Sequence, residues 1–169
     1  MIDRRALLRT TVALGALTLM TQVGKAQKMN TTEKAIDFKN LTEAEWRQRL
    51  NPAQFDVLRK HGTARAGTSP LNKEKRKGTF ACAGCDLPLF SSDTKFESGT
   101  GWPSFYQPLP NAVAEKTDRS FFMTRTEINC SRCAGHLGHV FNDGPKPTGL
   151  RYCMNGVALK FSAEGASSS

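Results

Sequence analysis

The chain has 169 residues, of which 38% are hydrophobic and 23% are charged. This length suits one domain, and this composition excludes a disordered or collagen-like chain. Lysine and arginine outnumber aspartate and glutamate by 24 to 15, which gives a formal net charge of +9. The one apolar stretch near the N-terminus is too short and too rich in threonine for a comfortable membrane span. We therefore expect a soluble protein built on one core.

Residues 1–26 have the three parts of an export signal. Arg4 and Arg5 lie at its start, residues 12–20 are apolar, and residues 24–26 have the small-x-small pattern of a cleavage site. Paired arginines followed by two leucines are typical of the bacterial twin-arginine signal; a Sec signal or an uncleaved anchor is the alternative. We predict a periplasmic protein. Removal of the segment takes away four basic residues and one acidic residue, which lowers the formal charge from +9 to +6.

Residues 27–40 are polar and without periodicity, which predicts a flexible lead-in. The sequence Thr-Glu-Ala-Glu at 42–45 has the form of a capping box and predicts a helix that runs to Leu50. Asn-Pro at 51–52 predicts a second short helix, with Gly62 as its end. The apolar faces of both helices are too small to be stable alone, so we expect them to pack on the rest of the chain.

Residues 61–78 form a basic segment that includes the charge run at 73–77. We interpret it as a solvated loop, with a docking site for an acidic partner as the alternative. From Thr79 onward, short β-type runs alternate with turn residues, which predicts an antiparallel sheet or a partly closed barrel. The predicted strands are 79–81, 87–90, 120–128, 149–153 and 157–161. We expect one mainly β domain over 41–162 and a disordered tail over 163–169.

Four of the five cysteines form two C-x-x-C pairs. Two such pairs supply the four soft ligands that a tetrahedral zinc site requires, and they would join segments 44 residues apart. Four thiolates fill every coordination position, so this zinc would be structural. The alternatives are two disulfides, or a redox-active pair. The four residues are Cys82, Cys85, Cys130 and Cys133.

The fifth cysteine, Cys153, has no sequence partner, so it is either a buried inert thiol or a reactive one. His136 and His139 are candidates for a proton donor and activator of that thiol. On a helical turn the two imidazoles would share a face, whereas on an extended strand they would point to opposite faces. His61 lies at the predicted end of the second helix, where we expect it only to cap that helix.

Residues 99–106 combine three aromatic side chains with glycine and proline, a composition that fits either a turn in the core or the wall of a shallow pocket. With a candidate nucleophile and two histidines elsewhere in the chain, we favour the pocket wall.

These segments resemble the methionine-R-sulfoxide reductase B family over about 41–161. The resemblance implies two antiparallel sheets, short helices on the N-terminal side, a structural zinc at the edge and a shallow active site. It rests on six ordered motifs: Cys82-x-x-Cys85, Ser98–Phe105, Cys130-x-x-Cys133, His136–Phe141, Asp143–Pro145 and Arg151–Asn155.

By the same resemblance, Cys153 is the nucleophile, and His136 and His139 serve the sulfoxide oxygen. The substrate it implies is the R epimer of methionine sulfoxide, mostly within proteins. The residues that we expect to bind this substrate are Trp102, which would receive its methyl group, Asn155, Arg151 and Phe141.

The residue types also fit this chemistry directly. A sulfoxide oxygen leaves badly, so a thiolate must attack sulfur while the oxygen is protonated. A free cysteine has a pKa of about 8.5, and a cation such as Arg151 would favour its thiolate. A free histidine, with a pKa of about 6.5, supplies a proton near neutral pH. Attack then leaves methionine and a sulfenic acid on Cys153.

Two positions depart from the family pattern. Many members carry a resolving cysteine where this chain has Thr100, and serine is frequent where it has Gly156. With four cysteines assigned to zinc, no thiol remains to capture the sulfenic acid. We therefore expect a thioredoxin-like or other external thiol to reduce Cys153; a zinc cysteine that also resolves is the alternative.

Two other classes of protein compete with this interpretation. A zinc-stapled binding module would use the positive charge to recruit nucleic acid or an acidic protein, but the basic residues are dispersed or confined to 73–77, and export removes nucleic acid as an ordinary partner. A zinc hydrolase or deaminase needs an open coordination position, and the sequence has no H-x-E pattern. We expect a monomer that acts on oxidised proteins.

Overall fold

The computed structural model describes residues 36–119 and 123–165. The predicted export signal, most of the lead-in and the last four residues of the tail lie outside them. Within the described residues, no helix is both long and apolar enough to cross a membrane. The helical elements are α1 (Glu43–Arg49), α2 (Pro52–Lys60) and the 3-10 turns η1 (Pro70–Lys73), η2 (Ser92–Thr94) and η4 (Gly156–Ala158).

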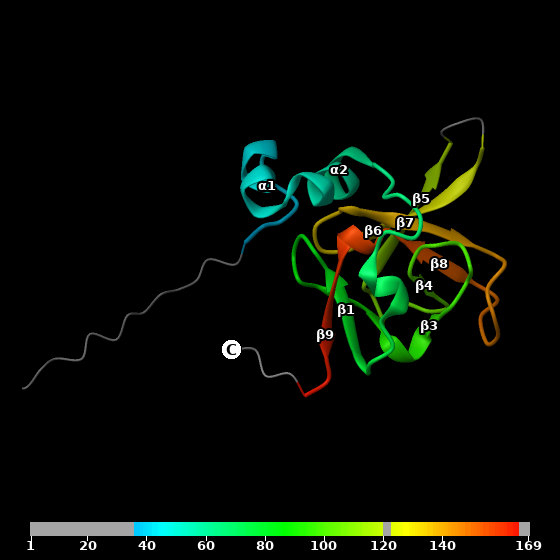
Figure 1. Cartoon of the computed structure of the whole chain (residues 1–169). Coiled ribbons are helices and arrows are strands. Elements are labelled where there is room, and N and C mark those ends of the chain that lie inside the picture. Colours follow the sequence, from blue (N-terminus) through cyan, green and yellow to red (C-terminus); the bar gives the residue numbers. More distant parts are fainter. Residues whose placement is uncertain (1–35, 120–122, 166–169) are drawn as a thin grey trace, which may run out of the picture. The chain divides into compact units, whose positions relative to one another are not determined.

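The described residues form two antiparallel sheets (Figure 1). The smaller sheet has the strand order β2-β1-β9, and the larger has the order β3-β4-β8-β7-β6-β5. The mainly β fold with two antiparallel sheets and short N-terminal helices is therefore confirmed. The strands are β1 (Gly78–Cys82), β2 (Pro88–Ser91), β3 (Lys95–Phe96), β4 (Ser104–Phe105), β5 (Val113–Asp118), β6 (Arg125–Cys130), β7 (His136–Phe141), β8 (Arg151–Met154) and β9 (Leu159–Ala163).

Both predicted helices begin with a capping box. The Thr42 hydroxyl accepts from the Glu45 backbone N–H, and the Glu45 carboxylate accepts from the Thr42 backbone N–H at 2.7 Å. This arrangement satisfies donors that the first helical turn leaves without partners. Helix α2 repeats it with Asn51 and ends at Lys60, followed by its C-cap His61, whose φ of 57° is left-handed. The predicted end at Gly62 is therefore two residues late.

Strand prediction was less accurate. The runs at 79–81 and 87–90 are largely strand, and the run at 120–128 overlaps β6, although residues 120–122 lie outside the described residues. Val157 lies in η4, so β9 begins two residues later than expected. Strands β5 and β7 were missed because β5 is largely exposed and polar and β7 contains a glycine and two histidines. Hydrogen bonds to neighbouring strands, which local sequence does not show, form them.

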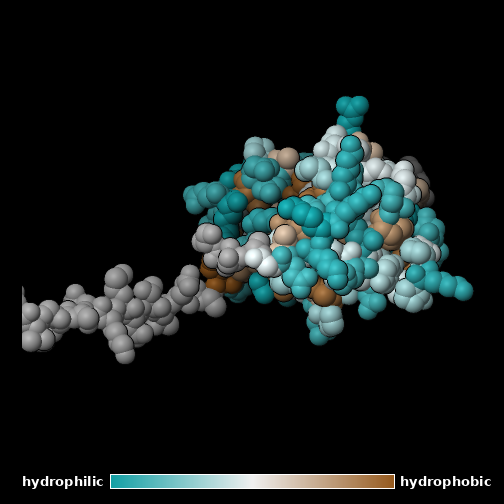
Figure 2. Space-filling model, turned by 60° about the horizontal axis from the view of Figure 1, so that its bottom comes forward, coloured by the Kyte–Doolittle hydropathy of each residue, from teal (hydrophilic) through white to brown (hydrophobic). Residues whose placement is uncertain are grey.

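The core lies between the two sheets and under the helices. The rings of Phe90 and Phe105 stack with centroids 4.3 Å apart, and Phe80 meets Phe105 edge-on at 5.0 Å. All three are fully buried, and burial of each such side chain contributes about 1.5–3 kcal/mol. Trp46 of α1 is also buried, so the helices are part of this core. Polar side chains dominate the face in Figure 2, with only small, separate hydrophobic patches.

Candidate active site

Strand register places Cys153 beside His139. Cys153 on β8 is paired with His139 on β7, and His139 is paired with Glu127 on β6. On the other side, Ser104 of β4 pairs with Cys153. Side chains at paired positions project from the same face of a sheet, so these four form one row across it. The next residue along β8, Met154, is fully buried in the core.

A β-bulge brings the two histidines of β7 together. Ile128 of β6 pairs with Gly138, but its neighbour Asn129 pairs with His136, so β7 has one extra residue at this point. The extra residue turns a separation of three into an effective separation of two, and side chains two apart share a face. The ring centroids of His136 and His139 lie 5.4 Å apart. The two imidazoles therefore share a face although they lie on a strand.

Each of these histidines contacts its own carboxylate. Nδ1 of the buried His136 donates to Glu127 Oε1 at 2.6 Å, and Nε2 of His139 lies 2.9 Å from Asp118 Oδ2. Burial lowers the pKa of His136, which favours its neutral form. Burial alone would raise the pKa of Glu127, but hydrogen bonds from His136 and then from Asn129 outweigh it and lower that pKa. The carboxylates thus fix the orientation of both rings.

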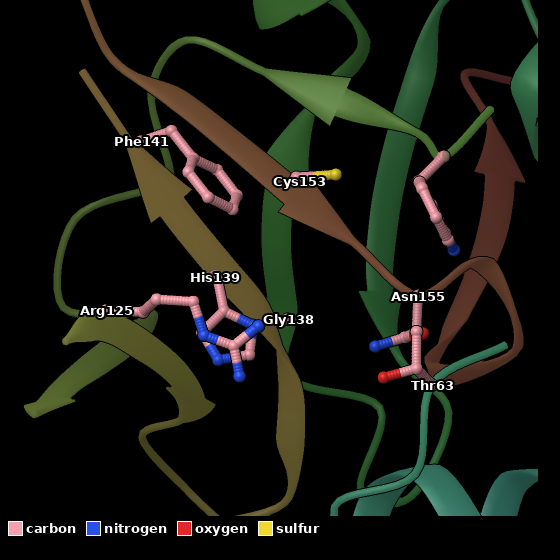
Figure 3. Close-up of a pocket in the computed structure, with 8 residues that line it drawn as sticks. Thr63, Arg125, Gly138, His139, Phe141, Cys153 and Asn155 are labelled. Atoms are coloured by element: carbon pink, nitrogen blue, oxygen red, sulfur yellow. The ribbon is translucent and has the colours of Figure 1, made fainter. Parts of the chain in front are cut away.

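The side chains of Cys153 and His139 line a cavity of about 140 Å³ (Figure 3). Figure 3 shows the imidazole of His139, the ring of Phe141 and the thiol of Cys153 around one space. The cavity has the size class of a single side chain rather than that of a large cofactor. Its lining residues are Thr63, Trp102, Arg125, Gly138, His139, Phe141, Cys153 and Asn155.

Hydrogen bonds hold the walls of this cavity in place. The indole of Trp102 donates to the carbonyl of Ala64 at 2.9 Å, and the Ala64 backbone N–H donates to Asn155 Oδ1 at 2.8 Å. The Asn155 amide also donates to the Leu137 carbonyl. At position 138, a Cβ would overlap the backbone of β8 next to Cys153, so Gly138 permits the close approach of the two strands there. Asn155 is therefore fixed by the protein itself.

Arg151 supports the cavity from behind. Its guanidinium donates two hydrogen bonds of 2.8 Å to the Asp143 carboxylate and lies 4.4 Å from the centroid of the Phe141 ring. The hydrogen bonds to Asp143 raise the pKa of Arg151, and so does the nearby thiol of Cys153. Arg151 does not line the cavity, and neither does His136. Both are placed to position the residues that do.

At position 100, where this chain departs from the family pattern, a chain of hydroxyl groups leads to Cys153. Thr100 Oγ1 lies 3.8 Å from Cys153 Sγ and 2.8 Å from Ser98 Oγ, which in turn lies 2.7 Å from Ser104 Oγ. A hydroxyl near 3.8 Å is within reach of a sulfur hydrogen bond, but it cannot form a disulfide. Thr100 is therefore a polar neighbour of the candidate nucleophile.

The second departure from the family pattern, Gly156, has a local cause. A Cβ at this position would overlap the side chain of Ser69. Ser69 caps η1 by accepting a hydrogen bond from the Leu71 backbone N–H. The absence of a side chain at 156 thus makes room for the segment that leads into η1.

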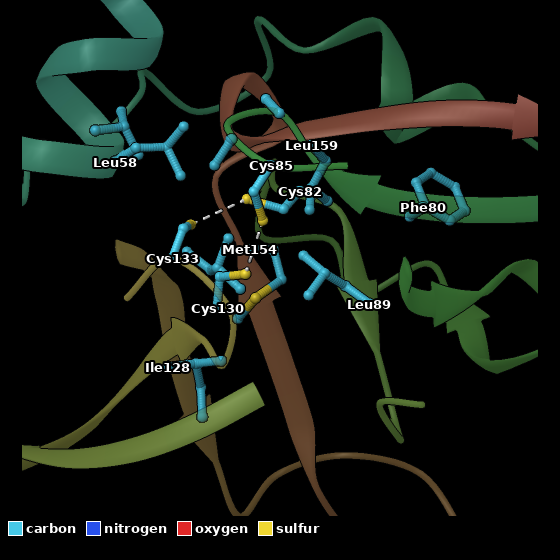
Figure 4. Packing of buried hydrophobic residues seen from close by; sticks show 14 of the residues in the cluster. Leu58, Phe80, Cys82, Cys85, Leu89, Ile128, Cys130, Cys133, Met154 and Leu159 are labelled. Atoms are coloured by element: carbon cyan, nitrogen blue, oxygen red, sulfur yellow. Dashed lines mark hydrogen bonds between the residues drawn. The ribbon is translucent and has the colours of Figure 1, made fainter. Parts of the chain in front are cut away.

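The four remaining cysteines form a separate buried cluster (Figure 4). Cys82 Sγ lies 3.7 Å from Cys133 Sγ, and Cys85 Sγ lies 3.5 Å from Cys130 Sγ. Zinc at about 2.3 Å from each of four tetrahedral sulfurs would place those sulfurs about 3.8 Å apart, so the geometry fits. None of the four is in a disulfide.

The protonation chemistry of the cluster also fits a cation. Hydrogen bonds with the thiols of Cys130 and Cys133, and then burial, raise the pKa of Cys82. Four buried thiolates repel one another and are unfavourable together unless a positive ion lies among them, and metal binding supplies that ion. The cluster can hold a metal ion with all four protein ligands.

Helix α2 packs on both cysteine pairs. A Cβ at Gly84 or Gly135 would lie 3.5 or 2.9 Å from the Leu58 side chain, so both glycines lie against it. Arg59 donates to the Cys133 carbonyl at 3.0 Å. The cluster thus joins strands β1 and β6, which lie in different sheets, beneath the helix that leads to His61.

Comparisons with known proteins agree with this arrangement. Residues 50–163 match the model of the SelR domain. The chain is 57% identical over 126 residues to the peptide methionine sulfoxide reductase MsrB of Leptospira interrogans, which covers 74% of this chain and 96% of that protein. It is 54% identical over 123 residues to MsrB of Agrobacterium fabrum, covering 72% and 91%. MsrB of Methanosarcina barkeri is 56% identical over 133 residues, covering 78% and 92%.

The chain belongs to the methionine sulfoxide reductase B family. The part that matches the family model includes the four-cysteine cluster, every residue that lines the cavity and the carboxylates that hold the histidines. Helix α1 ends just before the matched part, and helix α2 lies within it.

Several residues of the site were not identified from the sequence. Glu127 and Asp118 are single acidic residues on polar strands, and nothing in the sequence placed them beside the histidines. His61 is the C-cap of α2, as expected, but its imidazole also donates to Glu127 at 2.7 Å. Arg125 and Thr63 line the cavity from segments predicted as strand and loop. Only the pairing of β5, β6 and β7 reveals the carboxylate partners.

Proposed function

We propose that this chain reduces methionine-R-sulfoxide in proteins to methionine, with Cys153 as the nucleophile. Membership of the reductase B family supports the reaction, so the chain is a peptide-methionine (R)-S-oxide reductase. The single observation that carries the assignment of Cys153 is its position: a free thiol in register with His139 at the base of a cavity sized for one side chain.

The reaction moves one oxygen atom. The Cys153 thiolate attacks the sulfoxide sulfur while the sulfoxide oxygen accepts a proton; this oxygen ends on Cys153 as a sulfenic acid, and methionine leaves. One external thiol then forms a mixed disulfide with Cys153 and releases the oxygen as water. A second thiol breaks that disulfide and restores the Cys153 thiol. Two thiols are oxidised for each sulfoxide reduced.

We assign the proton donor for the sulfoxide oxygen to His139. It lines the cavity, it is paired with Cys153, and Asp118 orients its ring. His136 lies outside the lining, so its role is to position His139 through ring contact while Glu127 holds it. The two histidines, which the sequence alone did not distinguish, thus have different proposed roles.

Replacing His139 with Asn tests this assignment. General acid catalysis by a positioned side chain contributes about 10²–10⁴-fold, so we expect kcat/KM for methionine-R-sulfoxide to fall by that factor, mainly through kcat. Rapid-quench measurement of the first turnover reports the step directly. An H139N enzyme whose first turnover is as fast as that of the wild type would contradict the assignment.

Epimer selection follows from two fixed walls. We propose that Trp102 receives the substrate methyl group, with the ring of Phe141 across the cavity, while the oxygen faces His139. An inverted sulfur would exchange the methyl group and the oxygen, and it would present a polar oxygen to the indole. The hydrogen bond of Trp102 to Ala64 and the stacking of Arg151 on Phe141 hold the two rings in place.

Separated sulfoxide epimers test the proposed function. With dithiothreitol as reductant, we expect turnover of the R epimer and a rate at least about 100-fold lower for the S epimer, a difference of about 3 kcal/mol in transition-state binding. Chiral separation of the remaining sulfoxide measures both rates in one mixture. Equal consumption of the two epimers would overturn the proposal.

We also propose that an external thiol regenerates Cys153 and that the four-cysteine cluster holds a structural zinc. Thr100 cannot form a disulfide with Cys153, and the other four cysteines lie together in the buried cluster. Zinc there would have only a structural role and would hold β1 and β6 together, because its four sulfur ligands leave no open coordination position. A thioredoxin-like protein or a small dithiol fits the requirement for two electrons.

Export and oligomeric state are further proposals. The arginine pair and apolar run of residues 1–26 support export to the periplasm, by the twin-arginine route if the protein folds and binds metal first. A monomer is supported by the surface, since Ile36 and Met123 are the only exposed large hydrophobic side chains among the described residues. The open mouth of the cavity suits an oxidised methionine on the surface of another protein.

A further inference from the structure

Three side chains beside the reductase cavity form a second candidate metal site. They are His61 at the end of α2, Glu127 on β6 and His136 on β7, and their ligand atoms all lie within 4.8 Å of one another. Nδ1 of His61 lies 2.7 Å from Glu127 Oε1, and Nδ1 of His136 lies 2.6 Å from the same oxygen. Two imidazoles and one carboxylate are ligands that zinc prefers.

The geometry needs only a small adjustment to hold an ion. Ligand atoms around zinc lie about 3.0–3.5 Å apart, so each imidazole would move outward by about 0.5 Å. Glu127 and His136 are buried, whereas the His61 side chain is 58% exposed at the helix end. One exposed ligand beside two buried ones gives the ion a route in from solvent.

The surroundings leave space for the remaining ligand. The three side chains line a groove of about 370 Å³ that also contains Thr63 and His139 and opens to solvent, where water can complete a tetrahedron. Lys116, Arg119 and Arg125 line the same groove, together with one further carboxylate, Asp118. The positive charge of these three side chains weakens the binding of a cation, so we expect a reversible site, unlike the closed four-cysteine cluster.

We propose that His61, Glu127 and His136 bind a divalent zinc ion reversibly and that this ion inhibits the reductase. The binding itself does not depend on the enzyme's activity; the inhibition rests on the proposed function. An ion on Nδ1 of His136 replaces the hydrogen bond to Glu127 and shifts the ring that contacts His139, whose ring centroid is 5.4 Å away. His139 would then be displaced from Cys153.

The test uses the full chain with one zinc equivalent already in the four-cysteine cluster. Added Zn²⁺ is measured by equilibrium dialysis and metal analysis at pH 7.5, without thiols. We expect a second equivalent in the wild type, in Lys60→Ala as the matched control, and in Cys153→Ser. We expect none in His61→Asn, a change that suits the left-handed backbone of the helix end.

A first turnover of methionine-R-sulfoxide, which needs no external thiol, measures the consequence. We expect saturating Zn²⁺ to slow it at least 10-fold in the wild type and in Lys60→Ala, and to leave the rate of His61→Asn unchanged. A wild type that binds no second equivalent would overturn the site, as would a second equivalent retained by His61→Asn or lost by Cys153→Ser. Inhibition that persists in His61→Asn would overturn the mechanism. Equilibrium dialysis measures zinc binding without using the reductase activity, so it tests the metal site even if the epimer assay contradicts the proposed function.

Discussion

Replacement of Cys153 with Ser is expected to lower kcat/KM for methionine-R-sulfoxide by at least about 10⁴-fold, because a hydroxyl is a far weaker nucleophile than a thiolate and no other free thiol lines the cavity. The replacement removes no large side chain, and Cys153 is only half-buried, so the fold should not change. Steady-state assays with dithiothreitol and purified epimer measure the loss.

The matched control for this variant is Thr100→Val, which removes the hydroxyl nearest to the Cys153 sulfur and keeps the shape of the side chain. We expect it to retain most of the activity, since Thr100 lies at the edge of hydrogen-bond distance, 3.8 Å from Cys153 Sγ. Equal thermal unfolding midpoints and equal metal content would show that both variants are folded. Substantial activity in Cys153→Ser would contradict the assignment of the nucleophile.

Loss of the four-cysteine metal site should have the largest effect on stability. Replacing Cys82 and Cys130 with Ser removes one ligand from each pair and leaves polar hydroxyls in the buried cluster. Structural zinc contributes about 10–16 kcal/mol in small zinc domains, which matches or exceeds the total stability of a typical domain, about 5–15 kcal/mol. We expect the double variant to bind no metal at this site and to be unfolded at 25 °C. Heating it should then give no cooperative unfolding transition.

Circular dichroism during heating and metal analysis of the same sample test this prediction. Cys153→Ser is the control, because it also changes a cysteine to serine but lies outside the cluster. It should keep one metal equivalent and the wild-type melting temperature. A metal-free Cys82/Cys130 double variant that melts within about 5 °C of the wild type, which corresponds to only about 1–2 kcal/mol, would show that the metal does not hold the two sheets together.

Local sequence predicted the parts of this fold that depend on local chemistry. The capping box at Thr42 and the Asn-Pro pair at 51–52 were sufficient to place both helices, because the cap bonds join residues three apart. The two C-x-x-C pairs predicted the clustered cysteines for a similar reason, since each pair is a short turn with its own ligands. The resemblance implied two antiparallel sheets, but the order and partners of the strands came only from the structure.

The site was predictable only in part. Motifs identified Cys153, His139 and Trp102, and the structure places all three on one cavity. The shared face of His136 and His139 depends on a bulge that arises from pairing with β6, and the sequence contains no signal for it. Glu127 reaches His61 across 66 residues of chain, so its contact also depends on tertiary pairing. Long-range register, rather than residue type, decides these contacts.

The central claim is that the Cys153 sulfur takes the oxygen from the sulfoxide. One turnover without any external thiol, followed by trapping with a sulfenic-acid reagent and mass spectrometry of the cleaved protein, tests it most directly. We predict one methionine released per chain and one trapped sulfenic acid, located on the peptide that contains Cys153. A full equivalent of methionine released with Cys153 still a free thiol, or with the oxidation on any of the four clustered cysteines, would contradict the account.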